Sequence, residues 1–326
     1  MNRKESGASA RISARICSVM LVCVLVSVSG LRGATVTILF DRESPQAAFA
    51  CKEIQAALKA RGHSIAQSDL EQLQGVTEGV RIVLCPASDS GATGQMKSEG
   101  GRAPGALKSE GYSIRVTSGA GRSAFWAIGG DTAGVMYGGL ELAEVIRTDG
   151  FAAIKDVDQN PYMAMRGTKF NCPLDVRTPS YSDVSDAAQN NIIEMWSFDF
   201  WTEYIDNLAR HRYNYISLWS LHPFPSLVRV PDYPDVALDD VKRSTVQWAE
   251  YYPGNGTGFD APEILNDVET LKKMTIDEKI AFWRRVMRYG RDRNVDFYFV
   301  TWNIFVNGTD GKYGITDDID NPTTID

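Results

Sequence analysis

The sequence predicts a mixed α/β protein in which a small N-terminal α/β domain is followed by the first part of a TIM (β/α)₈ barrel. Residues 160–326 alternate strand and helix patterns, with three strands separated by two helices, which is how such a barrel is built. Residues 35–150 instead begin as strand, helix, strand and end as strand, strand, helix. A length of 326 residues suits about two domains. We therefore expect an α/β domain over 34–150, a linker over 151–160 and barrel strands 1–3 over 161–326.

The first 33 residues have the pattern of a secretory signal peptide. An apolar run over residues 16–28 is followed by small residues and preceded by basic ones, namely Arg3, Lys4, Arg11 and Arg15. The run is shorter than the roughly 20 residues that a transmembrane helix needs, although an uncleaved anchor remains the alternative. We expect a secreted or periplasmic protein.

Net charge and cysteine spacing indicate which partners, disulfides and metal sites are not expected. Without residues 1–33 the chain keeps 29 basic and 40 acidic residues, a net charge of −11. From such an acidic balance we expect no electrostatic attraction to nucleic acids or to anionic lipids. Cys51, Cys85 and Cys172 are widely spaced without CxxC, which favours buried thiols over a disulfide framework or a zinc site. With three histidines and no HExxH pattern, we expect neither a metal nor an organic cofactor.

In the first domain, residues 35–40 form a β-branched strand and Ser44-Pro45 starts a helix that ends at Gly62. Strands follow at 63–66 and 80–85. Residues 88–109 are rich in Gly, Ser and Ala without an apolar period, which predicts a surface loop. Strands at 112–116 and 123–128 then lead into a helix containing Met136 and Leu140.

The segment 129–134 (GGDTAG) joins a strand to a helix and invites comparison with a phosphate-binding loop. It matches neither GxGxxG nor GxxxxGK[ST]. Glycines that allow a tight turn and close packing of the helix explain it better.

The second domain follows the period of a barrel. Strands are expected at 163–170, 213–219 and 295–302, with helices at 194–210 and from a capping box at Thr275–Glu278 to about 293. Residues 223–274 are too long for a plain connection and predict an elaborated loop at the active face.

Polar and aromatic residues stand at the ends of the predicted barrel strands. Because catalysis in this fold takes place at the C-terminal strand ends, we expect these side chains to converge on one hollow that binds a sugar. Tryptophan rings stack on pyranose rings, and Arg or Asn side chains hydrogen-bond hydroxyls. A strand arginine can equally be an ion-pair partner at the barrel base, and the tryptophans can simply seal the mouth. The candidate substrate-binding residues are Arg166, Asn171, Trp219, His222, Trp302 and Asn303.

No catalytic carboxylate can be chosen from the sequence. Glycoside hydrolysis generally requires two carboxyl groups that flank the bond. The loops contain many, and none has neighbours that mark it as half of such a pair. We expect the catalytic carboxylates beyond the end of this chain.

Several short segments point to a known group of enzymes. They are YSI at 112–114, AIGGD at 127–131, GVMYG at 134–138 and NP at 160–161 with MRG at 165–167. Together they resemble the non-catalytic α/β domain and the barrel entry of β-hexosaminidases and xylan α-glucuronidases. In the first branch the resemblance implies that Arg166 contacts the terminal sugar, and in the second that Asn303 binds substrate. The α-glucuronidase WDN signature is absent, and NCPLD at 171–175 stands in its place.

These observations predict a secreted glycoside hydrolase, or a fragment of one, acting on a polysaccharide or its oligosaccharides. An α-glucuronidase-like activity is the first expectation and a β-N-acetylhexosaminidase-like activity the alternative. A non-catalytic carbohydrate-binding protein with a degenerate barrel is the alternative from another class.

Overall fold

A six-stranded sheet organises the first half of the chain. The computed structural model describes residues 35–119, 122–178, 186–220, 224–247 and 267–300. The strand order is β2-β1-β3-β5-β4-β6, with parallel pairing except along β4. The strands are β1 (Thr35–Phe40), β2 (Ser64–Asp69), β3 (Val80–Pro86), β4 (Tyr112–Gly119), β5 (Arg122–Gly129) and β6 (Val157–Gln159).

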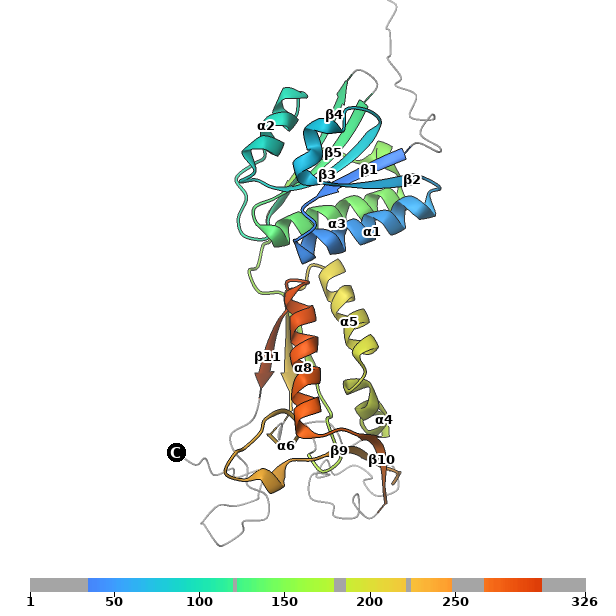
Figure 1. Ribbon diagram of the computed structural model, residues 1–326, viewed down its shortest axis with the longest axis vertical. Helices are drawn as coiled ribbons and strands as arrows, with labels where there is room; N and C mark the ends of the chain where they lie inside the picture. Colours follow the sequence, from blue (N-terminus) through green and yellow to red (C-terminus); the bar gives the residue numbers. More distant parts are fainter. Residues whose placement is uncertain (1–34, 120–121, 179–185, 221–223, 248–266, 301–326) are drawn as a thin grey trace, which may run out of the picture. The chain divides into compact units, whose positions relative to one another are not determined.

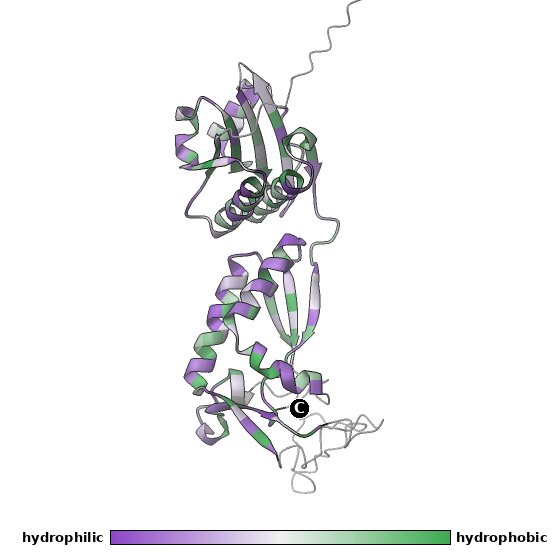
Figure 2. Ribbon diagram, turned by 90° about the vertical axis from the view of Figure 1, so that its right-hand side faces the viewer, coloured by the Kyte–Doolittle hydropathy of each residue, from purple (hydrophilic) through white to green (hydrophobic). Residues whose placement is uncertain are grey.

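Two long helices cover one face of this sheet. Helices α1 (Pro45–Ala60) and α3 (Thr132–Thr148) lie side by side below the strands in Figure 1. Helix α1 starts as predicted, because the Ser44 side chain accepts a hydrogen bond from the Ala47 N–H. A Cβ on Gly139 would lie 2.7 Å from the Ala50 Cβ, so this glycine allows the two helices to approach closely. Figure 2 shows hydrophobic residues both in the strands of this sheet and in the helices that pack on it.

The opposite face is covered by a helix that the sequence did not predict. Residues 88–109, expected as a loop, contain α2 (Ser90–Ser98), which packs with η2 (Leu70–Gly75). Asp89 caps α2, and Met96 is buried against Trp126 in a small hydrophobic cluster. The prediction was wrong because tertiary burial of two or three residues, rather than an apolar period, holds this short helix.

The expected linker over residues 151–160 also contains regular structure. After η3 (Phe151–Ala153), strand β6 pairs with Tyr112–Ile114 of β4 at the edge of the sheet. All three residues of β6 are exposed, so its side chains carry no alternating pattern that a sequence reading could detect.

The glycine-rich turn and the cysteines behave as predicted. A Cβ on Gly129 would lie 2.1 Å from the backbone nitrogen of Val135, so the glycine is required for close packing of α3. The thiols of Cys51, Cys85 and Cys172 are buried. Burial raises the pKa of the Cys85 thiol to about 12.

A second, parallel sheet follows in the order β11-β8-β7. Its register aligns residues 167–171, 215–219 and 296–300, so the three strands begin and end together. This confirms the predicted alternation of parallel strands and helices. The elements are β7 (Gly167–Asn171), α4 (Asp186–Met195), α5 (Phe198–Arg210), β8 (Tyr215–Trp219), α8 (Ile276–Arg291) and β11 (Asp296–Val300).

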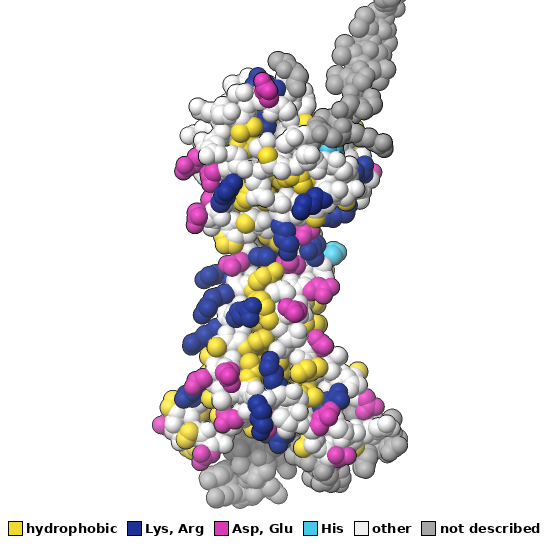
Figure 3. Space-filling model, turned by 45° about the vertical axis from the view of Figure 1, so that its right-hand side comes forward, with side chains coloured by type: hydrophobic (Ala, Val, Ile, Leu, Met, Phe, Trp, Pro, Cys, Tyr) yellow, Lys and Arg dark blue, Asp and Glu magenta, His cyan; other side chains and the backbone are white. Residues whose placement is uncertain are grey.

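Helices α5 and α8 pack on one face of the second sheet. Ile216 and Leu218 of β8 are fully buried together with Trp201 of α5 and Trp283 of α8. The helix expected over 194–210 is divided: α4 ends at Met195, and the Ser197 side chain caps α5 by accepting from the Phe200 N–H. The predicted capping box of Thr275 and Glu278 is present at the start of α8. Figure 3 shows Lys and Arg side chains gathered along one side of the surface, and the exposed residues of α8 include Arg284, Arg288 and Arg291.

The long excursion after β8 contains an antiparallel hairpin. It consists of β9 (Asp240–Ser244) and β10 (Val268–Lys273), preceded by α6 (Phe224–Leu227) and η4 (Pro234–Val236). The excursion is therefore partly ordered by pairing with itself.

Candidate functional site

The C-terminal ends of the parallel strands bring two of the predicted site residues together. Asn171 at the end of β7 is in register with Trp219 at the end of β8, and Trp219 is in register with Val300 of β11. The Cys172 N–H donates to the Trp219 carbonyl (2.9 Å), which continues the pairing beyond the strand. Asn171 and Trp219 therefore share one edge of the sheet, and their role in binding a sugar stays a prediction.

The face of the sheet that points away from α5 and α8 carries Trp219 and polar neighbours. Thr168 and Phe170 contact Tyr204 on the helical side, so the alternate residues of β7 point to the other side. There the Lys169 ammonium lies 4.3 Å from the centre of the Trp219 ring. The Trp219 indole N–H donates to the Ser217 hydroxyl (2.9 Å). A partly exposed aromatic ring thus has its orientation fixed and a cation beside it.

Arg166 does not join this group. It precedes β7 and lies beside Asn214, at the N-terminal end of the sheet, about 16 Å along the strand from Asn171 at the usual rise per residue. The prediction that Arg166 and Trp219 line one hollow was therefore wrong.

The Arg166 guanidinium is occupied by hydrogen bonds within the chain. It pairs with the Glu110 carboxylate and donates to the carbonyls of Arg212, Met163 and Ala164. This matches the alternative to sugar binding, in which a strand arginine is an ion-pair partner at the base of the barrel. The sequence analysis placed Arg166 inside a strand over 163–170, whereas β7 begins only at Gly167, so Arg166 stands before the strand.

The other three predicted site residues, His222, Trp302 and Asn303, lie outside the described residues. Their assignment to a sugar site stays a prediction.

A buried ionic cluster near the ends of the strands was missed by the sequence analysis. The Asp175 carboxylate accepts hydrogen bonds from Arg177 Nε (2.7 Å) and from the Lys242 N–H (2.9 Å). Arg177 also donates to the Asp240 carboxylate at 2.6 Å. Lys279 of α8 is fully buried and donates to the carbonyls of Leu238 and Asp240. The cluster ties the chain after β7 to β9 and to the first turns of α8.

The protonation states in this cluster favour a structural role. Burial by itself raises the pKa of Asp240, but the hydrogen bond and charge of Arg177 outweigh it, and the pKa lies below its usual value. Burial lowers the pKa of Lys279 to about 8. Asp240 is therefore ionised at neutral pH and has no proton to give to a leaving group. Asp175 is fully engaged, with its side chain inaccessible to solvent.

Neither a metal centre nor a membrane span is found in the part of the chain that the structure describes. No group of three His, Cys, Asp or Glu side chains in these segments is arranged to hold a metal ion. Within the same segments no helix is long and apolar enough to cross a bilayer.

Comparison with known proteins relates the fold to glycoside hydrolases. No family model and no curated protein matches the chain. Among solved structures it is similar to a GH138 enzyme targeting pectin rhamnogalacturonan II, at 18% sequence identity and a TM-score of 0.54. That match covers 83% of this chain and 32% of the other.

Two further structures match less well. One is a Glycoside Hydrolase Family 20 beta-N-acetylglucosaminidase, with 15% identity and a TM-score of 0.36 over 79% of this chain and 37% of the other. The other is the structure of CpGH84D, with 9% identity and a TM-score of 0.40 over 86% and 36%. Their TM-scores are too low to support a conclusion about this chain. The chain spans about a third of the length of the structures that it matches. The GH138 match shows that its fold is glycoside-hydrolase-like.

Proposed function

We propose that this chain is, or belongs to, an exported glycoside hydrolase that cleaves O-glycosidic bonds in a polysaccharide or its oligosaccharides. The observation that carries the proposal is the likeness to the GH138 enzyme targeting pectin rhamnogalacturonan II, which covers 83% of the chain and therefore both sheets. The placement of Asn171 and Trp219 at the C-terminal edge of parallel strands supports it, because enzymes with a (β/α)₈ barrel place their sites there. Export rests on the signal-peptide pattern of residues 1–33.

We further propose an α-glucuronidase-like specificity for an acidic sugar. The Lys169 ammonium beside the Trp219 ring supports this proposal. A uronic acid that contacts the ring would bring its carboxylate within reach of that cation.

In the proposed reaction one carboxyl group protonates the leaving oxygen, and a second acts as nucleophile or activates water. Asp175 and Asp240 are held in the ionic cluster described above and do not take these roles. The proposed pair comes from other carboxylates, outside the described residues.

The test is release of uronic acid from glucuronic-acid-substituted xylo-oligosaccharides by the full-length gene product. We expect Trp219→Ala to lower kcat/KM at least tenfold, because the stacking surface is lost. Lys169→Gln should lower kcat/KM for the acidic substrate while leaving that for a neutral aryl glycoside within twofold. Lys59→Gln, which removes an exposed lysine from α1, is the matched control and should change neither.

A non-catalytic carbohydrate-binding protein is the second candidate. It is favoured by the engagement of Asp175 and Asp240, the carboxylates of the ionic cluster near the strand ends, in ion pairs. Binding of the oligosaccharide that weakens in Trp219→Ala, without release of any sugar, would support this candidate and overturn the hydrolase.

A further inference from the structure

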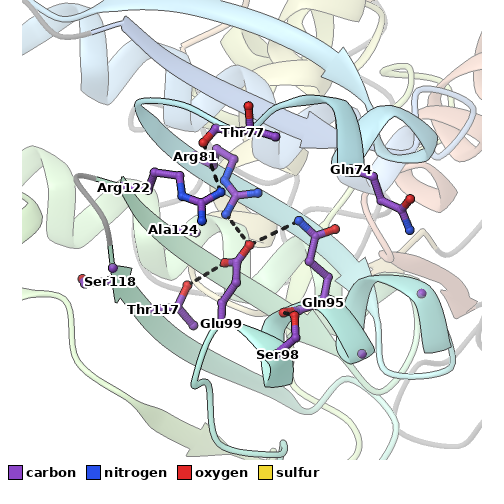
Figure 4. A pocket seen from close by; sticks show the side chains of 13 residues that line it. Gln74, Thr77, Arg81, Gln95, Ser98, Glu99, Thr117, Ser118, Arg122 and Ala124 are labelled. Carbon is purple, nitrogen blue, oxygen red and sulfur yellow. Dashed lines mark hydrogen bonds and ion pairs between the residues drawn. The ribbon is translucent and has the colours of Figure 1, made fainter.

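The first domain contains a cavity that takes no part in the proposed barrel site. It has a volume of about 570 Å³ and lies on the sheet face opposite α1 and α3, between η2, α2 and strands β3, β4 and β5. Pockets of this size hold small organic ligands, including one or two sugar units. Its lining is mainly polar, and Figure 4 shows the side chains around it.

One wall of the cavity is a preformed polar network centred on Glu99. Its carboxylate accepts hydrogen bonds from Arg81 (2.6 Å), Gln95 (3.2 Å) and Thr117 (3.1 Å), and Figure 4 shows the three side chains converging on it. The Thr117 hydroxyl accepts in turn from the indole N–H of Trp126 at 3.0 Å. These bonds fix the polar wall without any ligand.

The network leaves positive charge and hydrogen-bond donors in the cavity. Glu99 neutralises Arg81, whose side chain is only 2% exposed. Arg81 Nε is buried and has no hydrogen-bond partner among the described residues. Arg122 lines the same cavity and donates one guanidinium N–H to the Thr77 carbonyl at 3.2 Å. Two arginines against one carboxylate give the cavity lining a formal charge of +1.

A glycine keeps the cavity open. Gly94 lies inside α2, where glycine is less favourable than alanine. A Cβ built on Gly94 meets no atom within 4 Å, so packing within the protein does not require glycine here. Because Gly94 lines the cavity, we expect a bulky side chain at this position to enter it.

We propose that this cavity is a binding site for a sugar acid, a hydroxylated ligand of one or two sugar units with a single carboxylate. The carboxylate pairs with Arg122, and the hydroxyls meet the amide and hydroxyl groups of Gln74, Gln95 and Ser118. The site is separate from the strand ends of the barrel and does not depend on hydrolysis. Its role is to hold an acidic saccharide on the first domain.

The test is titration of the full chain with D-glucuronate, with D-glucose and with inorganic sulfate, followed by calorimetry or protein NMR shifts. We expect glucuronate to bind at least tenfold more tightly than either of the other two, a difference of about 1.4 kcal/mol or more. Arg122→Gln should weaken glucuronate binding at least tenfold. Lys97→Gln removes one exposed charge from α2 without touching the cavity, and it should change the Kd by less than twofold.

A second variant tests the cavity itself. Gly94→Leu introduces a better helix former that fills the space, so we expect binding to be lost while the Tm is unchanged or higher. Unchanged binding in Gly94→Leu and Arg122→Gln, or equal binding of sulfate and glucuronate, would overturn the proposal. Uronic acid release by Arg122→Gln should equal that of the wild type, so failure of the hydrolase proposal and failure of this one give different results.

Discussion

The two sheets of this protein differ in how they cover their faces. The six-stranded sheet is covered on one face by α1 and α3 and on part of the other by α2 and η2. The β11-β8-β7 sheet has one face packed by α5 and α8, whereas its other face, within the described residues, leaves Lys169 exposed and the Tyr298 ring 46% exposed. A mixed sheet can complete its own core, but a barrel strand has an inner face that only the other strands of the barrel can fill. Within the described residues, the first sheet therefore has cover on both faces, and the second has the one-sided packing expected of barrel strands.

Both regions nevertheless hold an edge in place with an ion pair in which one of the two side chains is fully buried. In the first, Asp158 of β6 pairs with the fully buried Arg115. In the second, Asp175 pairs with Arg177 and binds the backbone of β9. The comparison predicts that each pair stabilises its own region.

The largest effect is expected from Asp158→Ala. The substitution leaves Arg115 buried without its closest carboxylate, and such changes cost about 3–5 kcal/mol. Urea unfolding followed by hydrogen exchange should show the loss first in residues 35–160. Asp156→Ala is the control, because its carboxylate is 3.9 Å from Arg115 and more exposed, so the cost should be about 1 kcal/mol.

This pair also predicts how stability changes in acid. Burial by itself raises the pKa of Asp158, but its bonds to Ser113, Gly105 and Arg115 outweigh it and hold the pKa well below its usual range. A carboxyl group whose folded pKa is lowered contributes stability above its unfolded pKa of about 3.9 and loses it as the pH falls further. The wild type should therefore lose stability below about pH 4, and Asp158→Ala should lack that part of the loss. If the free energy of unfolding fell equally with pH in the two proteins, Asp158 would not be the cause of the loss.

A smaller effect is expected from Asp175→Asn in the second region. The amide keeps the shape but cannot accept from both Arg177 and the Lys242 N–H as a carboxylate does, which should cost about 2–4 kcal/mol. Hydrogen exchange should rise in β9 and the first turns of α8 and stay unchanged in β4 and β5. An equal rise of hydrogen exchange in both sheets would show that the two regions unfold together, and it would contradict the prediction that each ion pair stabilises its own region.

The smallest effect concerns Lys279 and alkaline pH. The folded pKa of about 8 lies below the unfolded value of about 10.4, so the unfolded chain binds more protons between these values. Stability should therefore rise by about 1–3 kcal/mol from pH 8 towards pH 10. In Lys279→Met this rise should be absent, as measured by urea unfolding at each pH. If the free energy of unfolding of the variant rose by the same amount, the rise would come from a titratable group other than Lys279.

The sequence predicted the position of some residues of the candidate site and not of others, because some positions depend on contacts between distant segments. Asn171 and Trp219 were placed at one edge because the C-terminal ends of parallel strands meet, and the alternation of strands and helices predicts parallel strands. Arg166 was misplaced because its role depends on Glu110, a residue 56 positions earlier in the chain. The Asp175 cluster was missed because Arg177, Asp240 and Lys279 meet only after folding.

The sequence by itself determined the order and type of most elements, because helix caps and hydrophobic periods act over a few residues. Ser44, the Thr275–Glu278 box and the three parallel strands belong to this class. Only the tertiary structure decided α2, β6, the partner of Arg166 and the cavity beside Glu99. Each of these depends on burial or hydrogen bonding between segments far apart in the chain, and no local pattern records such contacts.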